Sequence, residues 1–445
     1  MTTYKSIGRK AWRPVGALAG ALLVLAACSS LLDVKNPNDV SESALANPAA
    51  ATPIVNGVLA STVRMLAGIT TPYAVTTDEL DWIGSRDAWG ELENGVVSDY
   101  LNEFSDGAFP YVGEARYIGD DGIARLEAFD AAGTLSSRAL LANAYLYTAI
   151  TYASIADMYD DFAFSSKTVP AKPIGRANMG TMYDKAVTYL DKANTIAQTS
   201  AGTAAMRFNI LAYRARVKHA KAVWQKITPK GATAPANPLV NDAGAVADAN
   251  LAIAAGTSAD QKFTIFCNIE ACFSNIGITI WYEVNGRNES ALGVVYKNLL
   301  DPVSGAKDPT VQALLAQFTA FGTQTGTFTL SSQREMHLIL AEAALAAGNT
   351  ATFRTELNFV RALDGKPAYT GTPISDQAML AYERKAQLWL MRRRLADMYR
   401  FGQKDSKWVD KPGLESANSV VGLLFPIPNV ERLGNPCVND PTLCP

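Results

Sequence analysis

The chain has 445 residues, of which 48% are hydrophobic and 18% are charged, a globular composition that can bury a large core. Its formal net charge is −2, and it has no extended basic stretch. Because nucleic-acid binding needs clustered Lys and Arg to neutralise phosphates, nucleic acid is excluded as a partner. The length permits two or three domains, although a single helical array is equally compatible with it.

The first 27 residues have the pattern of a secretory signal. Basic residues between Lys5 and Arg13 precede a run of aliphatic and small side chains, Val15 to Ala27. As a helix this run covers only about 20 Å, less than a hydrocarbon core of about 30 Å, so a permanent membrane span is not expected. Residues 1–27 are therefore predicted to be a signal peptide, and their removal takes the net charge from −2 to −6.

The signal ends in Leu25-Ala26-Ala27 before Cys28, which resembles the lipobox of bacterial lipoproteins. The resemblance implies cleavage before Cys28 and attachment of a diacylglycerol to Cys28 Sγ, which would anchor the chain in a membrane. Ser29 and Ser30 follow in place of an Asp, which favours the outer membrane over the inner one. An ordinary cleaved signal with a chance cysteine is the alternative.

Four cysteines remain after Cys28, and an even number in an oxidising compartment indicates disulfides. Four cysteines permit three connectivities. Proximity in the sequence favours two local bridges, Cys267–Cys272 and Cys437–Cys444.

No metal site, cofactor or catalytic motif is predicted. A zinc site would need short paired spacings with histidine nearby, whereas His219 and His337 lie in helical patterns. Asp157, Asp160 and Asp161 lack the oxygen-rich loop of a calcium site and indicate an acidic turn at a helix end. The sequence has no nucleophile elbow, phosphate-binding glycine loop or His-Glu-x-x-His, so an enzyme is not expected, although carboxylate pairs for glycoside hydrolysis are too numerous to exclude by sequence.

The body of the chain is predicted to be mostly helical. Apolar residues recur every three or four positions in several segments. The predicted helices are about Ala139–Asp157 after a Ser136 or Ser137 cap, Thr181–Ala197 with a Thr181/Asp184 capping box, about Ala205–Lys226, about 243–255, Gln333 to Gly348, and a helix from Asn349 or Thr350. The last two form a helix hairpin, the unit of helical-repeat scaffolds. Since no strict 34-residue repeat is present, the array is expected to be degenerate.

Other segments lack this periodicity. Residues 228–241 indicate a loop, and residues 70–110 are expected to be irregular. Short strand-like runs are Ile276–Tyr282 and Ala291–Tyr296. The tail from Gly402 is expected to be an ordered coil held on the body. The Arg392-Arg393-Arg394 cluster is interpreted as salt-bridged, because successive residues point in different directions around a helix.

The order of motifs along the chain resembles the SusD/RagB family of nutrient-uptake lipoproteins. After the lipid cysteine comes Leu31-Leu32-Asp33-Val34-Lys35-Asn36-Pro37-Asn38, similar to the start of mature family members. The later matches are the Tyr-rich helix ending Met158-Tyr159-Asp160-Asp161, Tyr189-Leu190-Asp191-Lys192-Ala193, Ala341-Glu342-Ala343 with Leu357-Asn358-Phe359-Val360-Arg361, the Glu-Arg-rich helix Glu383–Gly402, and the closing Leu424-Phe425-Pro426-Ile427-Pro428. Gln387, Met391, Arg392 and Asp160 depart from the family pattern.

The resemblance implies an all-α dominated, SusD-like fold with a degenerate TPR-type helical-repeat scaffold, loop-rich regions and a few short strands. It implies one domain, 28–445, with an N-terminal part of about 28–226 and a loop-rich C-terminal part of about 227–445. It further implies a non-enzymatic protein on the outer-membrane surface that captures an oligomeric glycan or peptide for a SusC-like TonB-dependent transporter. The alternative is a helical-repeat scaffold for envelope assembly, without a small-ligand cleft.

Two tryptophans are the predicted ligand contacts. Trp82 and Trp89 lie among charged and glycine residues outside any helical stripe. An indole beside hydrogen-bonding groups can stack on a sugar or peptide while polar groups pair with its edge. The alternatives are that these indoles hold the loop on the helices, and that the site lies around Trp281 and Tyr282.

Overall fold

The computed structural model describes residues 42–166, 168–200, 203–268, 270, 272 and 279–444. Cys28, the signal peptide and the Leu31–Asn38 motif lie outside the described residues. The chain divides into two compact units, Met1–Ala50 and Ala51–Pro445. In the first unit the described residues form a short helix, α2 (Glu42–Leu45), and a 3-10 turn, η1 (Pro48–Ala50).

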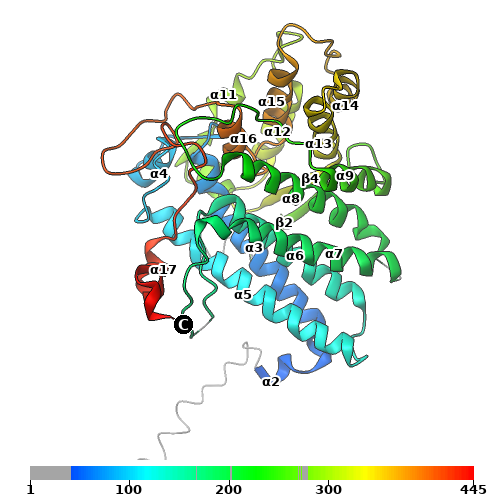
Figure 1. Cartoon of the computed structure of the whole chain (residues 1–445), viewed down its shortest axis with the longest axis vertical. Coiled ribbons are helices and arrows are strands. Elements are labelled where there is room, and N and C mark those ends of the chain that lie inside the picture. The colour runs from blue at the N-terminus through cyan, green and yellow to red at the C-terminus, as the bar shows by residue number, and fades with distance from the viewer. Residues whose placement is uncertain are drawn as a thin grey trace, which may run out of the picture. The chain divides into compact units, whose positions relative to one another are not determined.

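The second unit is dominated by helices that pack side by side (Figure 1). Tyr145, near the start of one helix, donates a hydrogen bond to Glu127 near the end of the preceding helix, and Tyr183 donates to Asp157 in the same way, so these successive helices are antiparallel. In packing order they are α3 (Ala51–Val75), α5 (Glu103–Ala131), α6 (Arg138–Met158), α7 (Gly180–Thr199), α8 (Arg207–Ile227), α9 (Ala243–Ala255), α13 (Gln333–Ala346) and α14 (Thr350–Leu363). The prediction of a helix-dominated, TPR-like array is confirmed.

Helix α6 has the start that the sequence predicts. The Ser137 hydroxyl accepts a hydrogen bond from the Ala139 N–H, and the three small residues Ala142, Ala149 and Ala156 are fully buried, so the neighbouring helices approach closely. By length and composition α6 and the helix ending at Val75 could cross a membrane, but both are mostly buried, as expected of core helices.

The hairpin of α13 and α14 is also confirmed. Gly348 has a φ of +77°, the left-handed conformation that ends a helix at its C′ position. Asn349 then caps α14 by accepting a hydrogen bond from the Thr352 N–H. Phe353 and Leu357 are buried in the core between the two helices.

The Thr181/Asp184 capping box is wrong. Helix α7 already begins at Gly180, so Thr181 lies inside its first turn and its hydroxyl donates back to the carbonyl of Asn178. Asp184 instead forms an ion pair with Lys221 on α8. Because the helix begins at Gly180, with Met179 in the N-cap position, Thr181 cannot act as its cap.

The prediction that residues 70–110 are irregular is wrong for most of that segment. Helix α3 extends to Val75, β1 (Leu80–Trp82) follows, and α4 (Asp87–Glu93) precedes α5. Helix α5 starts before residue 110 because the Asn102 side chain accepts hydrogen bonds from the N–H groups of Phe104 and Ser105, an N-cap that satisfies otherwise unpaired donors.

The described strands form two antiparallel pairs. β1 pairs with β3 (Ser290–Leu292), and β2 (Lys262–Cys267) pairs with β4 (Gly326–Ser332). The predicted strand Ala291–Tyr296 is wrong beyond Leu292, because α11 (Val294–Lys297) begins there. The predicted strand Ile276–Tyr282 lies partly outside the described residues, and from Ile280 onward the backbone is helical, including the π-turn η5 (Tyr282–Gly286).

The Glu-Arg-rich segment is two helices rather than one. α15 (Asp376–Gln387) ends four residues after Glu383, and α16 (Arg394–Arg400) starts after a turn that contains Leu390 and Arg392, both at a φ of +57°. We call residues 388–393 the connecting turn. It places side chains in directions that a continuous helix would not allow.

The C-terminal segment is held on the N-terminal helices, as predicted, but the expectation that it is coil throughout is wrong, because its last part is helical. Trp408 Nε1 donates to the Thr76 carbonyl at 2.9 Å, and the Phe425 N–H donates to the Met158 carbonyl at 2.9 Å. The segment ends in α17 (Asn429–Gly434), α18 (Pro436–Asn439) and η6 (Pro441–Leu443).

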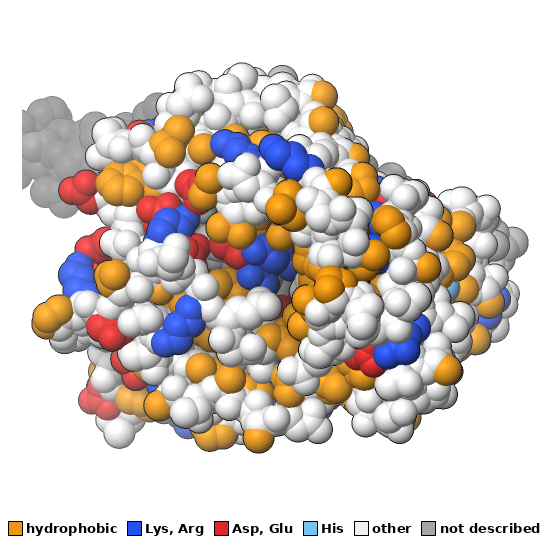
Figure 2. Space-filling model, turned by 90° about the horizontal axis from the view of Figure 1, so that it is seen from above, with side chains coloured by type: hydrophobic (Ala, Val, Ile, Leu, Met, Phe, Trp, Pro, Cys, Tyr) orange, Lys and Arg blue, Asp and Glu red, His pale blue; other side chains and the backbone are white. Residues whose placement is uncertain are grey.

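Figure 2 shows the face above the view of Figure 1, on which hydrophobic side chains and several Lys or Arg side chains surround a hollow.

Candidate ligand-binding groove

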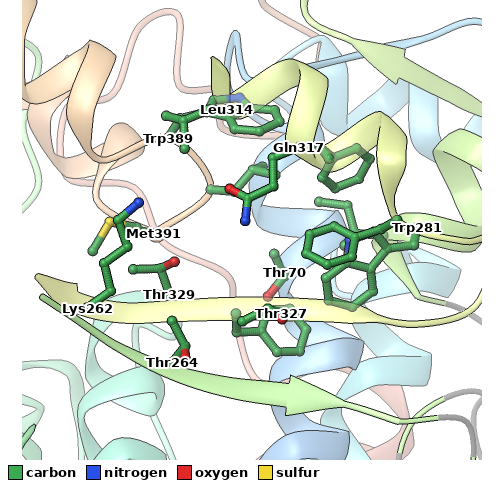
Figure 3. Close-up of a pocket in the computed structure, with 15 residues that line it drawn as sticks. Thr70, Lys262, Thr264, Trp281, Leu314, Gln317, Thr327, Thr329, Trp389 and Met391 are labelled. Atoms are coloured by element: carbon green, nitrogen blue, oxygen red, sulfur yellow. The ribbon is translucent and has the colours of Figure 1, made fainter. Parts of the chain in front are cut away.

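A groove opens between helix α12 (Pro309–Ala320), the β2–β4 pair and the connecting turn (Figure 3). A second hollow shares Lys262, Gln317, Trp389 and Met391 with it, so the two form one continuous depression, which we call the aromatic groove. Its lining is Thr70, Lys262, Thr264, Ile280, Trp281, Leu314, Gln317, Phe318, Phe321, Thr327, Phe328, Thr329, Trp389, Leu390 and Met391, with Thr310, Ala313, Ser332, Arg334, Asp364 and Gln387 at its polar end.

Helix α12 supplies one wall through its periodicity. Leu314, Gln317, Phe318 and Phe321 are spaced by three, one and three residues, which places them along one side of the helix. The helix begins where the Asp308 carboxylate accepts a hydrogen bond from the Val311 N–H at 3.0 Å. In Figure 3 the Gln317 side chain points from α12 into the groove.

The strand pair supplies the opposite wall through its alternation. Side chains of β2 are alternately exposed and buried, with Lys262 and Thr264 on the exposed side. Thr264 lies opposite Thr329 in the ladder, so their side chains lie on the same face. With Thr327 they give a row of hydroxyls that faces α12 across the groove (Figure 3).

Aromatic rings form the deep end of the groove. The Trp281 ring centroid lies 4.9 Å from that of Phe328 and 6.2 Å from that of Phe318, with which it is stacked. Phe318 also meets Trp389 edge to face at 5.6 Å. Because each ring is held by at least one other ring, the wall is rigid and loses little conformational entropy when a ligand binds.

The connecting turn brings Trp389 and Met391 to the groove, and two buried side chains hold it. Glu79 Oε1 accepts a hydrogen bond from the Leu390 N–H at 2.6 Å, and Arg216 donates to the Met391 carbonyl. Burial raises the pKa of Glu79 to about 7. The position of Trp389 therefore depends on residues that lie far from it in the sequence.

The polar end of the groove is an internally paired network. Arg334 binds Asp260 through Nε and Nη2, at 2.6 and 2.9 Å, and Asp364 through Nη1. Thr310 also donates to Asp364. Burial alone would raise the pKa of the Asp364 carboxyl, but hydrogen bonds from Arg334 and Thr310 outweigh it and lower that pKa. The network stays charged and rigid.

The predicted ligand contacts Trp82 and Trp89 lie outside this groove. Trp82 is partly buried on β1, and its indole covers Gly90 so closely that an added Cβ would lie 2.7 Å from the ring. Trp89 is fully buried on α4 and stacks on Phe104. Trp89 and Phe104 also line a separate pocket with Tyr111. This placement supports the packing alternative for Trp89, and ligand contact by either indole stays a prediction. Trp281, from the alternative location, lines the aromatic groove.

Arg393 and Arg394 form salt bridges, as interpreted from the sequence, whereas Arg392 forms none among the described residues. Arg393 pairs with Asp157, and Arg394 binds both oxygens of Asp78, at 2.7 and 2.8 Å. Arg392 is buried, and burial lowers the pKa of its guanidinium to about 10.

The two histidines are also accounted for by packing. His219 pairs with Glu342 at 2.9 Å, and His337 pairs with Glu356 at 2.7 Å. Burial lowers the pKa of His219. Among the residues that the structure describes, no group of three or more His, Cys, Asp or Glu is placed to hold a metal ion.

Both predicted disulfides are present. Cys267 is bonded to Cys272 with a Cα–Cα distance of 5.8 Å, and Cys437 to Cys444 with 5.7 Å, in the usual range for a bridge. The first lies at the end of β2, beside the aromatic groove. The second closes the C-terminal tail.

Several groove residues were missed from the sequence although two of the signals were present. The α12 stripe of Leu314, Gln317, Phe318 and Phe321 is visible as a helical period, and the alternation of Thr327 and Thr329 as a strand period. Nothing local identifies Trp389, because its exposure to the groove depends on the connecting turn. Lys262 is likewise an ordinary strand lysine until β4 and α12 are placed against it.

The fold is similar to that of solved SusD-type structures. A SusD superfamily protein from Bacteroides fragilis matches with a TM-score of 0.60 at 18% identity, covering 88% of this chain and 99% of that one. A SusD-like carbohydrate binding protein from Bacteroides vulgatus matches with a TM-score of 0.57 at 12% identity, covering 88% and 97%. A laminarin binding SusD-like protein matches with a TM-score of 0.56 at 14% identity, covering 87% and 97%. No family sequence profile and no curated protein matches the chain. The chain thus has the SusD-like fold.

Proposed function

We propose that the protein is a non-catalytic, surface-exposed lipoprotein that binds an oligomeric nutrient, a glycan in preference to a peptide, in the aromatic groove. The observation that carries the proposal is the groove itself: rigid aromatic rings face a row of threonine hydroxyls and the Gln317 amide. Stacking on a ring and hydrogen bonding at its edge are the two interactions that a sugar requires. The SusD-like fold and the two neighbours named for carbohydrate and laminarin binding support this reading.

The remaining parts of the proposal concern the cell envelope. The chain is cut before Cys28, anchored by lipid in the outer membrane as one domain, 28–445, and passes its ligand to a SusC-like TonB-dependent transporter. The lipobox-like sequence and the SusD-like fold support this arrangement. The alternative envelope-assembly scaffold needs no small-ligand cleft, so the presence of the groove favours capture.

Ligand binding is tested by calorimetry of the soluble chain against glycan oligosaccharides and peptides. Gln317→Ala removes a polar group that points into the groove, and we expect a loss of affinity of about 1 kcal/mol or more. Gln312→Ala, on the same helix but outside the groove lining, is the matched control. If the wild type binds a ligand and neither Gln317→Ala nor Phe321→Ala changes the affinity, the binding site lies elsewhere.

Location and partner are tested in cells. Cys28→Ser should abolish acyl labelling and release the protein from the membrane fraction. Protease added to intact cells should degrade a surface protein and spare a periplasmic one. Pull-down from detergent-solubilised outer membrane should recover a large β-barrel transporter. Recovery of assembly machinery without such a barrel would support the scaffold instead.

A further inference from the structure

We propose that the aromatic groove selects an acidic glycan, one whose sugar rings carry carboxylate or sulfate groups. This inference rests on the proposed function and adds the ligand class. It depends on which polar groups face the groove, because a neutral sugar needs donors and acceptors in similar measure, whereas a carboxylate or sulfate offers acceptors only.

The first observation is an uncommitted cation. Lys262 opens β2 on its exposed side and lines both parts of the groove. Figure 3 shows its side chain extending along the groove beside Met391. Among the described residues Lys262 forms no ion pair, whereas Arg334 nearby binds two carboxylates. The Lys262 ammonium is therefore available to a ligand.

The second observation is that the groove has no free carboxylate. Asp364 is the one acidic residue among the described residues that line it. Its Oδ2 accepts from Arg334, Thr310 and Gln387, the last at 3.3 Å. The Oδ2 atom of Asp364 is therefore occupied by internal donors, one of which is the Arg334 guanidinium.

The third observation is that neither indole of the aromatic wall offers a hydrogen-bond acceptor to a ligand. The Nε1 atoms of Trp281 and Trp389 are buried and have no hydrogen-bond partner within the described part of the chain. An indole N–H cannot accept a hydrogen bond. Lys262 is therefore the uncommitted charged donor of the groove, and its ammonium would form a charge-assisted bond with a carboxylate or sulfate of the ligand, the stronger kind of hydrogen bond.

The test compares matched ligands that differ only in charge. Oligogalacturonates and oligoglucuronates are titrated beside their carboxyl-reduced counterparts, and sulfated oligosaccharides beside their desulfated forms. We expect the wild-type protein to bind an acidic member at least tenfold more tightly than its neutral counterpart, with a preference that weakens as salt is added. Whether the carboxylate or the sulfate pair shows the preference identifies the acidic group.

Variants assign the preference to the groove. Lys262→Gln should remove the difference between acidic and neutral members, and Lys262→Arg should keep most of it. Lys307→Gln, an exposed lysine outside the groove lining, should leave the preference unchanged and controls for net charge. Equal affinity of the wild type for both members of every pair, or an unchanged preference in Lys262→Gln, overturns the inference while leaving glycan binding intact. Absence of binding to any oligosaccharide refutes the proposed function instead.

Discussion

The backbone N–H of Leu390 donates a 2.6 Å hydrogen bond to Oε1 of Glu79, a residue more than 300 positions earlier in the chain. Glu79 is fully buried. The neighbouring Asp78 is held in its charged form by Arg394 and Lys385. Among the described contacts no such cation binds Glu79, so ionisation of its buried carboxyl is unfavourable. The connecting turn is therefore held by a carboxyl group whose pKa is about 7.

Stability should therefore fall as pH rises. Burial raises the pKa of Glu79 from 4.5 to about 7, so folding favours its neutral form. The resulting stabilisation is complete below about pH 4.5 and lost as pH rises through about 7, an effect of roughly 3 kcal/mol. Glu79→Gln keeps an acceptor for Leu390 and should be more stable than the wild type at pH 8. Urea unfolding at pH 5 to 8 measures this, and parallel pH profiles of the two proteins would contradict it.

Loss of the Glu342 carboxylate should be severe. Glu342 is fully buried and binds Arg400, His219 at 2.9 Å, and the Val240 N–H at 3.0 Å. Burial would raise its pKa, but Arg400 and His219 hold that pKa well below its usual range. Glu342→Gln leaves the buried Arg400 and Arg384 to share the single carboxylate of Asp397 and should cost about 3–5 kcal/mol in denaturant unfolding.

The partly exposed pair of Glu356 with His337 is the control for Glu342. The Glu356 side chain is 23% exposed, so Glu356→Gln should cost less than about 1 kcal/mol. Similar losses in the two variants would show that the Glu342 network contributes no more than a surface pair.

Crowding Trp281 should disturb the groove. A Cβ at Gly326 would lie 2.0 Å from the indole, and the ring cannot retreat because Phe328 and Phe318 support it. Gly326→Ala should cost about 1–3 kcal/mol of stability and weaken ligand binding. Gly322→Ala, where nothing lies within 4 Å of the added Cβ, should do neither. Calorimetry and thermal unfolding of the pair decide, and equal behaviour of both variants would argue against a rigid wall.

Substitution of Trp82 and of Trp89, the two predicted ligand contacts, should lower the stability of the protein by different amounts. Trp89→Ala removes a fully buried ring and should cost about 3–5 kcal/mol. Trp82 is only partly buried, so Trp82→Ala should cost less. If Trp82→Ala lowers affinity by about 1 kcal/mol or more with its melting temperature unchanged, a ligand also reaches β1. No change in affinity in either folded variant would assign both indoles to packing.

The disulfides should act locally. Each bridge closes a short loop, so removing one by paired Cys→Ser substitution should cost about 2 kcal/mol, the low end for disulfides. Loss of Cys267–Cys272 should also weaken ligand binding, because β2 lines the groove, whereas loss of Cys437–Cys444 should not. Peptide mapping without reductant provides the connectivity, and cross-links between the two pairs would refute the assignment.

Local rules predicted the helices well. Ser137 and Asn349 act as caps, and Gly348 ends α13, because each of these roles depends on a few adjacent residues. The sequence failed where tertiary contacts decide the backbone. The connecting turn interrupts an apparently helical segment because Glu79 and Arg216, distant in sequence, hold Leu390 and Met391 in place.

The candidate site was predicted less well for the same reason. Trp82 and Trp89 stood out by their charged neighbours, yet Trp89 lies on a helix that places it in the core. The groove instead combines β2, β4, α12 and the connecting turn. Lys262 and Trp389 are separated by more than 120 residues, and no local pattern indicates that they share a surface.

The attachment of the C-terminal segment to the first helices bears on how the chain matures. Trp408 donates to the Thr76 carbonyl, the Leu395 N–H donates to the Tyr73 hydroxyl, and the Phe425 N–H reaches the end of α6. Unpaired buried polar groups are costly, so α3 and α6 are incomplete until these late residues arrive. A chain that emerges N-terminus first must therefore wait for almost its whole length before its first helices reach their final state, and a product truncated before Leu395 would remain a target for proteases.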